Sequence, residues 1–465
     1  MSGTGVRRAV GAATIALMAI ALSTSVSAGS LESALAQAYN NNPQLNAQRA
    51  SVRATDETVS QALAGYRPRV SAGADAGIQS FESTTASIFG GKTVTRDVLH
   101  PRGANISAVQ TVFNGFRTGN QTRQAEATVL SAREALRNVE QSVLLDAVTA
   151  YMNVLRDGAI LDLQRRNVEV LDEQLRQTRD RFNVGEVTRT DVAQAESRQA
   201  AARSQVLAAE ANLKTSRAAY RRVIGVEPAN LRPGMPVDRL FPRSLEGAVG
   251  LGHNEHPQVI AAQYTVDAAQ FAVKVAESQL SPTVTLEGNV QKRWDLGPGT
   301  FDQFTATGLT RLSVPIYQGG AEYSAIRQAK ETLGQRRIEL DFARDQVRAL
   351  VVQAWGQLEA TKAQIQAAQA QVTAAEVALN GVREEARVGQ RTTLDVLNAQ
   401  QELVNARVAL VTAQRDRVVA SFTLLSAVGR LSAQVLRLPV ASYDARVHYH
   451  QVRDKWFGVR TPDGK

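Results

Sequence analysis

Two long, uninterrupted helical patterns constrain the fold of this chain more than any other feature. Between Gly115 and Phe182, and again between Gln318 and Arg387, apolar residues recur at steps of three and four and no proline intervenes. At about 1.5 Å per residue, each pattern predicts a rod of roughly 100 Å. Because such a rod is far longer than a globular core, we expect each one to turn at a glycine and return as a shorter helix. The predicted helices are 116–182, 190–224, 319–387 and 393–428.

The two patterns belong to two copies of one design, because short motifs recur in the same order in each half of the chain. The matching motifs are Ser30-Leu31-Glu32 and Ser244-Leu245-Glu246, Asn42-Pro43-Gln44 and His256-Pro257-Gln258, Phe113-Asn114-Gly115 and Tyr317-Gln318-Gly319, and Val184-Gly185 and Val388-Gly389. This duplication predicts an internal two-fold repeat. The predicted organisation is a first repeat at 29–225, a proline-rich linker at 226–243, a second repeat at 244–432 and a disordered tail at 433–465.

The N-terminus has the pattern of a secretory signal peptide. Arg7 and Arg8 precede an apolar run, and small residues lead up to Ala28. We therefore expect cleavage after Ala28 and assign 1–28 to the signal peptide. No later stretch is apolar over the roughly 18 or more residues that a transmembrane helix needs.

Each repeat also contains two stretches in which apolar and polar residues alternate, as around Val70 and Val290. This period of two predicts strands with one apolar and one polar face. The predicted strands are 66–80, 104–114, 282–294 and 303–316, and helices at 31–64 and 244–279 precede the two strand pairs. Each strand reaches the roughly 9–11 residues that a tilted strand needs to cross a bilayer. The long segment 79–103 is expected to be an extracellular loop.

Four strands cannot close a barrel, since about eight strands is the practical minimum. An open sheet in lipid would leave the amides of its edge strands without partners, so we expect several copies to share one barrel. Two copies would give a barrel filled by side chains, and three would leave a lumen. With the long helices hanging from the same strands, the sequence predicts a mainly α protein with a β-barrel portion that forms a conduit.

Several other classes of function are excluded or disfavoured. The chain has no cysteine, which excludes disulfides, thiol nucleophiles and cysteine-ligated metals. Its basic residues are interspersed with acids, so we expect no nucleic-acid partner. His253 and His256 have the spacing of half a metal site but lack an evident third ligand. We expect no metal, no cofactor and no enzymatic activity.

One segment carries a family resemblance. Val388-Gly389-Gln390-Arg391-Thr392-Thr393-Leu394-Asp395-Val396-Leu397-Asn398-Ala399 resembles the helix turn of the TolC outer-membrane efflux protein family, and 184–192 resembles its partner in the first repeat. The resemblance implies a homotrimer in the outer membrane of a Gram-negative bacterium, with a shared twelve-stranded barrel and a trimeric α-barrel tunnel in the periplasm. It also implies docking to a periplasmic adaptor and to an inner-membrane ABC or resistance-nodulation-division transporter.

The same resemblance assigns roles at the two helix turns. Val184, Gly185, Val388 and Gly389 are expected to form the periplasmic tips that contact the adaptor, with each glycine at positive φ. An alternative is that the glycines only cap helices, which is compatible with this role.

The remaining assigned residues form a predicted periplasmic gate. Asp395 matches an aspartate that lines the closed entrance, where three symmetry copies would bring like charges together. The family's second aspartate is Asn398 here, so we expect a less charged constriction. Arg391 matches a residue that tethers the inner helices to Thr190 and Asp191 of the other hairpin, although Asp191 alone also fits a helix N-cap.

The resemblance implies a passive exit duct for type I protein secretion, multidrug efflux or both. The alternative is a periplasm-spanning coiled-coil scaffold anchored in the outer membrane. The four amphipathic strands of bilayer length favour the conduit, because a scaffold does not need them. The cargo stays open, since specificity in such systems lies mostly in the inner-membrane partner.

Overall fold

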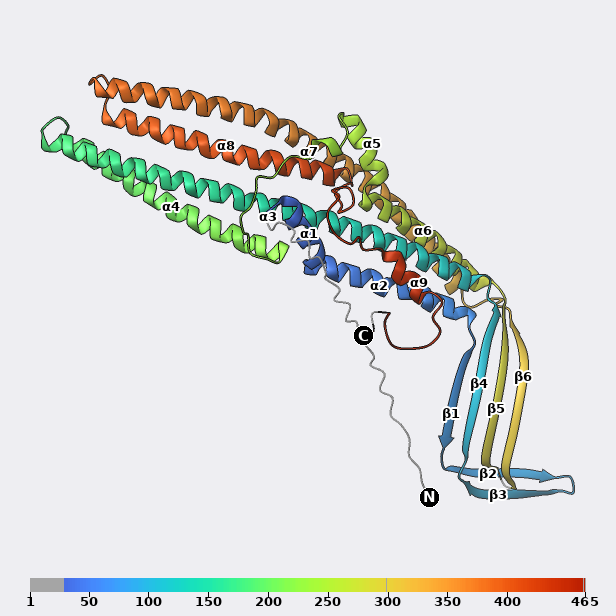
Figure 1. Ribbon diagram of the computed structural model, residues 1–465. Helices are drawn as coiled ribbons and strands as arrows, with labels where there is room; N and C mark the ends of the chain where they lie inside the picture. Colours follow the sequence, from blue (N-terminus) through green and yellow to red (C-terminus); the bar gives the residue numbers. More distant parts are fainter. Residues whose placement is uncertain (1–28, 298, 463, 465) are drawn as a thin grey trace, which may run out of the picture.

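The computed structural model describes residues 29–297, 299–462 and 464. It is an elongated helical body with a β-sheet at one end (Figure 1). The predicted signal peptide lies outside the described residues. The first repeat comprises α1 (Leu31–Asn41), α2 (Pro43–Leu63), β1 (Arg69–Ala76), β2 (Gln79–Ser87), β3 (Gly91–Leu99), β4 (Arg102–Phe113), α3 (Arg117–Asn183) and α4 (Arg189–Ile224). The rest comprises α5 (Leu245–Glu255), α6 (Pro257–Glu277), β5 (Thr283–Gly297), β6 (Thr300–Ser313), α7 (Ala321–Arg387), α8 (Thr393–Ala427) and α9 (Ala445–Val452), with 3₁₀ turns at Ala64–Tyr66, Asp238–Leu240 and Ser278–Leu280.

The helices expected at 31–64 and 244–279 are each two helices, broken at the X-Pro step. Asn42 ends α1 and caps α2, because its Oδ1 accepts the N–H of Gln44 at 2.9 Å. Pro43 then occupies the first helical position, where no N–H is needed. In the second repeat, His256 Nδ1 accepts the N–H of Gln258 at 3.2 Å in the same way. The prediction of single helices was wrong because it gave the Asn-Pro and His-Pro steps no weight.

Two further segments differ from expectation. The segment 79–103, expected to be a loop, contains the antiparallel hairpin β2–β3, which forms a sheet of its own. The tail, expected to be disordered, contains α9, which lies against α2, and it contacts the body as far as Trp456. His448 Nδ1 lies 3.0 Å from Oδ2 of the buried Asp56 on α2, and the N–H of Tyr443 donates to the Tyr39 hydroxyl at 3.0 Å.

The main sheet has four antiparallel strands in the order β1-β4-β5-β6. The pairing of β4 with β5 joins the two repeats, with Ile106 opposite Val290. Within the described chain, β1 and β6 each pair on one side, which leaves both edges of the sheet open. Apolar side chains on the strands are exposed, including Val70 at 69% and Leu312 at 63%. In a single chain, the edge strands of this sheet lack pairing partners and its apolar side chains lack a surface that covers them.

Across the described ranges, no helix combines the length and the apolar character needed to cross a membrane.

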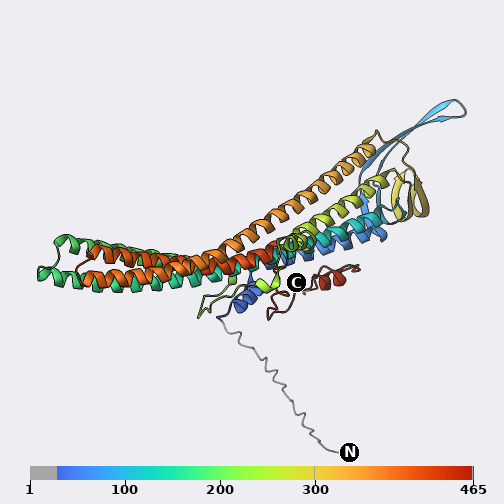
Figure 2. The ribbon, with the colours of Figure 1, turned by 90° about the horizontal axis from the view of Figure 1, so that it is seen from above.

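Two helical hairpins, α3–α4 and α7–α8, lie side by side with their turns at the end of the body far from the sheet (Figures 1 and 2). The long helices α3 and α7 have 67 residues each, or roughly 100 Å. The main core gathers near the middle of the body, where α1, α5 and the linker meet the hairpins. There the buried Tyr151 hydroxyl donates to the Gly29 carbonyl at 2.8 Å and accepts the N–H of Arg232 at 3.1 Å.

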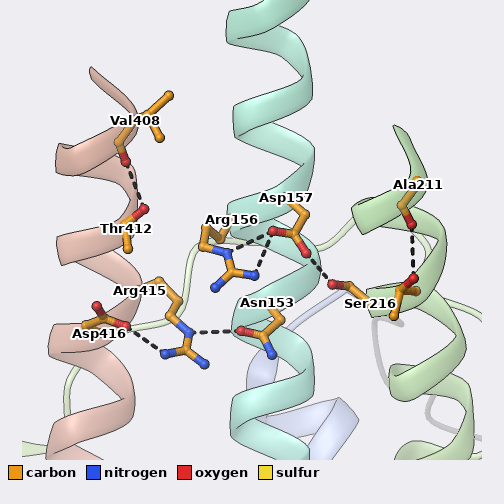
Figure 3. A network of polar contacts seen from close by, with 10 residues as sticks. Asn153, Arg156, Asp157, Ala211, Ser216, Val408, Thr412, Arg415 and Asp416 are labelled. Atoms are coloured by element: carbon orange, nitrogen blue, oxygen red, sulfur yellow. Dashed lines mark hydrogen bonds and ion pairs between the residues drawn. The ribbon is translucent and has the colours of Figure 1, made fainter. Parts of the chain in front are cut away.

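Polar contacts also connect α3 to both of its neighbours (Figure 3). Arg415 of α8 donates from Nε to Asn153 at 2.9 Å and from Nη1 to Asp416 at 2.6 Å. On the other side of α3, Asp157 accepts the hydroxyl of Ser216 from α4 and the Nε of Arg156. The first hairpin is thus joined to the second through α3.

Candidate functional site at the tip of the body

The candidate site consists of the two turns that connect α3 to α4 and α7 to α8. Each turn begins with a glycine in the left-handed region, Gly185 at φ 81° and Gly389 at φ 79°. In the first turn, the Glu186 N–H donates to the Arg181 carbonyl at 2.9 Å and the Gly185 N–H to the Phe182 carbonyl at 2.9 Å. The second turn repeats this pair of bonds from Gln390 and Gly389. This is the Schellman motif, which requires a residue that tolerates positive φ.

A capping box closes each turn and starts the return helix. Thr188 Oγ1 accepts the N–H of Asp191 at 3.3 Å, and Asp191 Oδ2 accepts the N–H of Thr188 at 2.9 Å. Thr392 and Asp395 do the same at 3.2 Å and 3.0 Å. Thr188 and Thr392 are the N-caps, and both predicted gate aspartates are the third helical residues that complete the capping boxes, so Asp395 shares the structural role of Asp191.

These contacts favour the charged form of both carboxyl groups. The hydroxyl and then the backbone N–H of Thr188 hold the pKa of Asp191 below its usual value. For Asp395, the backbone N–H of Thr392 is the main cause of a lowered pKa, and the hydroxyl of Thr392 follows. Each chain thus presents two ionised carboxylates at the tip at neutral pH.

Arg391 does not contact the first hairpin within this chain. Its Nε donates to Glu385 Oε2 at 2.8 Å, across its own turn. This bond is also the first cause of a raised Arg391 pKa, and the charges of Glu385 and Asp395 follow. Thr190 is exposed in the first turn of α4, and Asp191 Oδ2 accepts the N–H and the hydroxyl of Thr188. The tether expected between Arg391 and the pair Thr190 and Asp191 is not among the contacts of the described chain.

Other residues bring the two hairpins together instead. Asn398 Oδ1 accepts Nη2 of Arg198 at 2.7 Å, which links α8 to α4. Two residues further along α8, Gln400 Nε2 donates to Asn167 Oδ1 of α3 at 3.3 Å. Leu397 is only 2% exposed and packs into an apolar cluster of the first hairpin. The other members of that cluster are Leu171, Leu175, Ala195 and Ala202, with Val168 and Val192 at its margin.

The outer surface of the tip is apolar at two equivalent points. Val184 is 72% exposed and Val388 is 71% exposed, each directly before its glycine. A Cβ on Gly185 or Gly389 would have no atom within 4 Å, so both turns project into open space. Exposed valines on hydrogen-bonded turns can bind a partner through shape and apolar contact.

Sequence reasoning missed Arg198 and Glu385. The Glu385–Arg391 pair has a counterpart in Arg181 and Glu186 of the first turn, joined at 3.0 Å, so opposite charges flanking each glycine were an available signal. No local pattern singles out Arg198, because its partner lies in the other repeat.

The arrangement offers charge and shape rather than reactive chemistry. Within the part of the chain that the structure describes, no group of three or more His, Asp or Glu side chains could hold a metal ion. His256, one member of the predicted half-site, serves as a helix cap. Its burial and then the charge of Arg137 lower its pKa to about 4.

Comparison with known proteins agrees with the duplicated helical fold. The family model described as "Outer membrane efflux protein" matches residues 34–226 and 252–430, and so covers both repeats. The chain is 42% identical over 440 residues to the outer membrane efflux protein BepC of Brucella suis, covering 94% of this chain and 93% of BepC. It is 26% identical over 350 residues to the alkaline protease secretion protein AprF of Pseudomonas aeruginosa, covering 73% and 72%.

Among solved structures, the outer membrane channel CmeC of Campylobacter jejuni matches with a TM-score of 0.76 at 16% identity, covering 91% of this chain and 89% of that one. The predicted fold, mainly α with long hairpins, a β portion and an internal repeat, is thereby confirmed. The family consists of outer-membrane channel proteins and not of enzymes, which confirms the predicted location and the absence of catalysis. This chain belongs to the outer membrane efflux protein family.

Proposed function

We propose that three copies of this chain form an exit duct across the outer membrane and the periplasm. The observation that supports this most directly is the four-stranded sheet with open edges at β1 and β6. Joining β6 of one copy to β1 of the next would satisfy both edges and give a closed barrel of twelve strands. The exposed apolar residues of the strands would then face lipid, and three copies leave a lumen where two would not.

The two long hairpins supply the tunnel. They leave the sheet together and end in tips at one level, so three copies would place twelve helical segments around a common axis (Figures 1 and 2). The duct is passive, because the family to which the chain belongs consists of outer-membrane channel proteins. Transport would be driven by an inner-membrane transporter of the ABC or resistance-nodulation-division type, coupled through a periplasmic adaptor.

The adaptor would dock on the tips. Val184 and Val388 are exposed beside Gly185 and Gly389, and the two turns have the same backbone geometry. Two equivalent turns in each of three copies would present six similar docking points. This arrangement suits a partner that also presents repeated helical hairpins.

The gate would lie just inside the tips. Asp395 is ionised and half-buried, so three copies would bring three carboxylates around the axis. The contacts between Arg198 and Asn398 and between Leu397 and the first hairpin would hold each α7–α8 hairpin inward. Docking would open the duct by separating the two hairpins at these contacts.

Single-channel recording from purified protein in planar bilayers tests the duct directly. Discrete conductance steps are expected, whereas a scaffold would give none. Chemical cross-linking in native envelopes should end at three copies, and a ladder that ends at one copy would contradict the proposal.

The gate is tested by Asp395→Ala, which should raise the single-channel conductance and lower the preference for cations. Thr392→Ala is the matched control, because it removes the capping hydroxyl but keeps the carboxylate. An equal change in both variants would assign the effect to the helix cap. An unchanged conductance in Asp395→Ala would remove this residue from the gate.

The cargo is a separate part of the proposal. The relatives include one protein named for efflux and one named for protease secretion. A deletion strain tested for drug susceptibility and for missing secreted proteins would separate the two roles. Loss of neither would contradict the export function.

A further inference from the structure

The C-terminal tail carries a feature that the duct does not use. After α9, the loop 455–460 displays three apolar side chains to solvent: Trp456 is 60% exposed, Phe457 is 86% exposed and Val459 is fully exposed. Exposed aromatic residues of this size on a short loop are unusual unless another surface covers them. The loop is built to hold this shape, because Lys455 Nζ donates to the Arg460 carbonyl at 2.6 Å and closes it.

The loop is held at the junction between the helical body and the sheet. Arg67, two residues before β1, donates from Nη1 to the Lys455 carbonyl at 2.8 Å. Its guanidinium also lies over the Trp456 ring, 4.7 Å from the centroid. Trp456 is therefore fixed beside the point where the chain enters the first strand.

The segment that leads to the loop is anchored as well. Helix α9 lies along α2 (Figure 1), and His448 contacts the buried Asp56. The Arg133 guanidinium from α3 lies over the Tyr449 ring at 5.1 Å and reaches Asp56 at 3.6 Å. The contacts of α9 with α2 and α3 thus set the position at which the loop begins.

Other exposed aromatic residues occur at the same junction. Tyr66 precedes β1, Phe116 follows β4 and Tyr317 follows β6, and they are 56%, 74% and 77% exposed. Aromatic residues concentrate where a membrane-spanning segment meets water, because their rings are apolar and tolerate the headgroup region. Trp456, held beside Arg67, adds an aromatic residue of the tail to this junction.

Charge near the loop fits a lipid surface. The segment 453–462 contains three basic residues, Arg453, Lys455 and Arg460, and one acidic residue, Asp454. Basic residues beside an exposed aromatic pair favour binding to phospholipid headgroups, including anionic ones. A protein partner is less favoured, because the apolar surface is small and Trp456 lies beside Arg67, which directly follows the exposed Tyr66.

We propose that the loop 455–460 is a membrane-interface anchor, in which Trp456, Phe457 and Val459 insert into the periplasmic leaflet of the outer membrane. This rests on the proposed insertion of the sheet, which sets the level of the membrane. The anchor braces the helical body against the membrane from outside the sheet. It gives the tail a defined ligand, a phospholipid surface.

The three tryptophans of the chain allow a direct test. Variants that keep only one tryptophan each, with the other two changed to Phe, are reconstituted into vesicles of phosphatidylethanolamine and phosphatidylglycerol. The acyl chains are either normal or brominated near the headgroup, and bromine quenches a tryptophan that reaches the chains. Trp294, near the far end of β5, reports insertion of the sheet, and Trp355, packed beside the main core, is the unquenched reference.

We expect brominated vesicles to quench Trp456 to an extent similar to Trp294 and to leave Trp355 unchanged. In the Trp456-only background, Phe457→Ser with Val459→Ser should reduce the quenching of Trp456. Quenching of Trp294 without quenching of Trp456 would overturn the anchor and leave the duct intact. Failure to quench either residue would overturn both the anchor and the proposed insertion of the sheet.

Discussion

The junction at the end of α8 gives the sharpest test of how the two repeats fit together. Gly429 follows α8 at φ 83°, and its neighbour Arg430 forms a bidentate ion pair with Glu255 at 2.7 and 2.8 Å. A Cβ added to Gly429 would lie 2.6 Å from Cα of His256 and 2.9 Å from the carbonyl oxygen of Glu255. Both neighbours are backbone atoms at the α5–α6 break, so they cannot move aside as a side chain would.

Gly429→Ala should therefore be destabilising for two reasons. Alanine in the left-handed region costs about 1–2 kcal/mol, and forcing an atom into a filled space adds about 1–3 kcal/mol. Gly389→Ala is the matched control, since Gly389 has a similar φ of 79° but no atom within 4 Å of the added Cβ. Gly389→Ala should therefore lose only the stability that the left-handed backbone conformation costs an alanine.

Unfolding by urea in detergent, followed by helical circular dichroism, measures the difference. The midpoint should fall by roughly twice as much or more in Gly429→Ala as in Gly389→Ala, at an unchanged slope. Equal shifts would refute the reasoning, because they would show that the α5–α6 backbone yields without loss of stability.

Two further predictions concern pH and the contact between hairpins. The pKa of His256 is lowered to about 4 in the folded chain, so the unfolded chain binds a proton near its ordinary value of 6.5 before the folded chain does. The contribution of His256 to the free energy of unfolding should be complete above about pH 6.5, and roughly 3 kcal/mol should be lost as the pH drops to about 4. His256→Asn, which copies Asn42 of the first repeat, should flatten this pH dependence in acid unfolding. An unchanged profile would exclude His256 as its source. Leu397→Ala should lower the free energy of unfolding by about 2–5 kcal/mol and lower the protection of amides against hydrogen exchange near the tips. The control is Leu394→Ala, where the side chain is 36% exposed, and equal loss of protection in both variants would contradict the packing argument.

Local sequence patterns were sufficient for most of the architecture. The long helices α3 and α7 begin and end within a few residues of the predicted 116–182 and 319–387, because their periodicity is long and uninterrupted by proline. The strands β4, β5 and β6 also lie close to the predicted ranges, since alternation over many residues is specific for a strand. The errors lie at the helix breaks before Pro43 and Pro257, in the segment 79–103, which contains β2 and β3, and in the tail, which contains α9.

The candidate site was predictable in position but not in detail. The glycine turns and the threonine–aspartate spacing are local, so their repetition located both tips. The partner of Asn398 is Arg198 and depends on which helices lie side by side, and the sequence does not specify the distance between residues two hundred positions apart. The tether expected from Arg391 to the other hairpin stays a prediction, and within this chain Arg391 binds Glu385 of its own turn.

The sequence alone determined the duplication, the periods of the helices and strands, and the turns, because each depends on interactions between residues close along the chain. Only the tertiary structure decided that β4 pairs with β5, that Leu397 packs into the first hairpin and that the tail lies along α2 beside the strands. These contacts join segments far apart in sequence, and they form where apolar surface and buried polar groups find complementary partners in three dimensions.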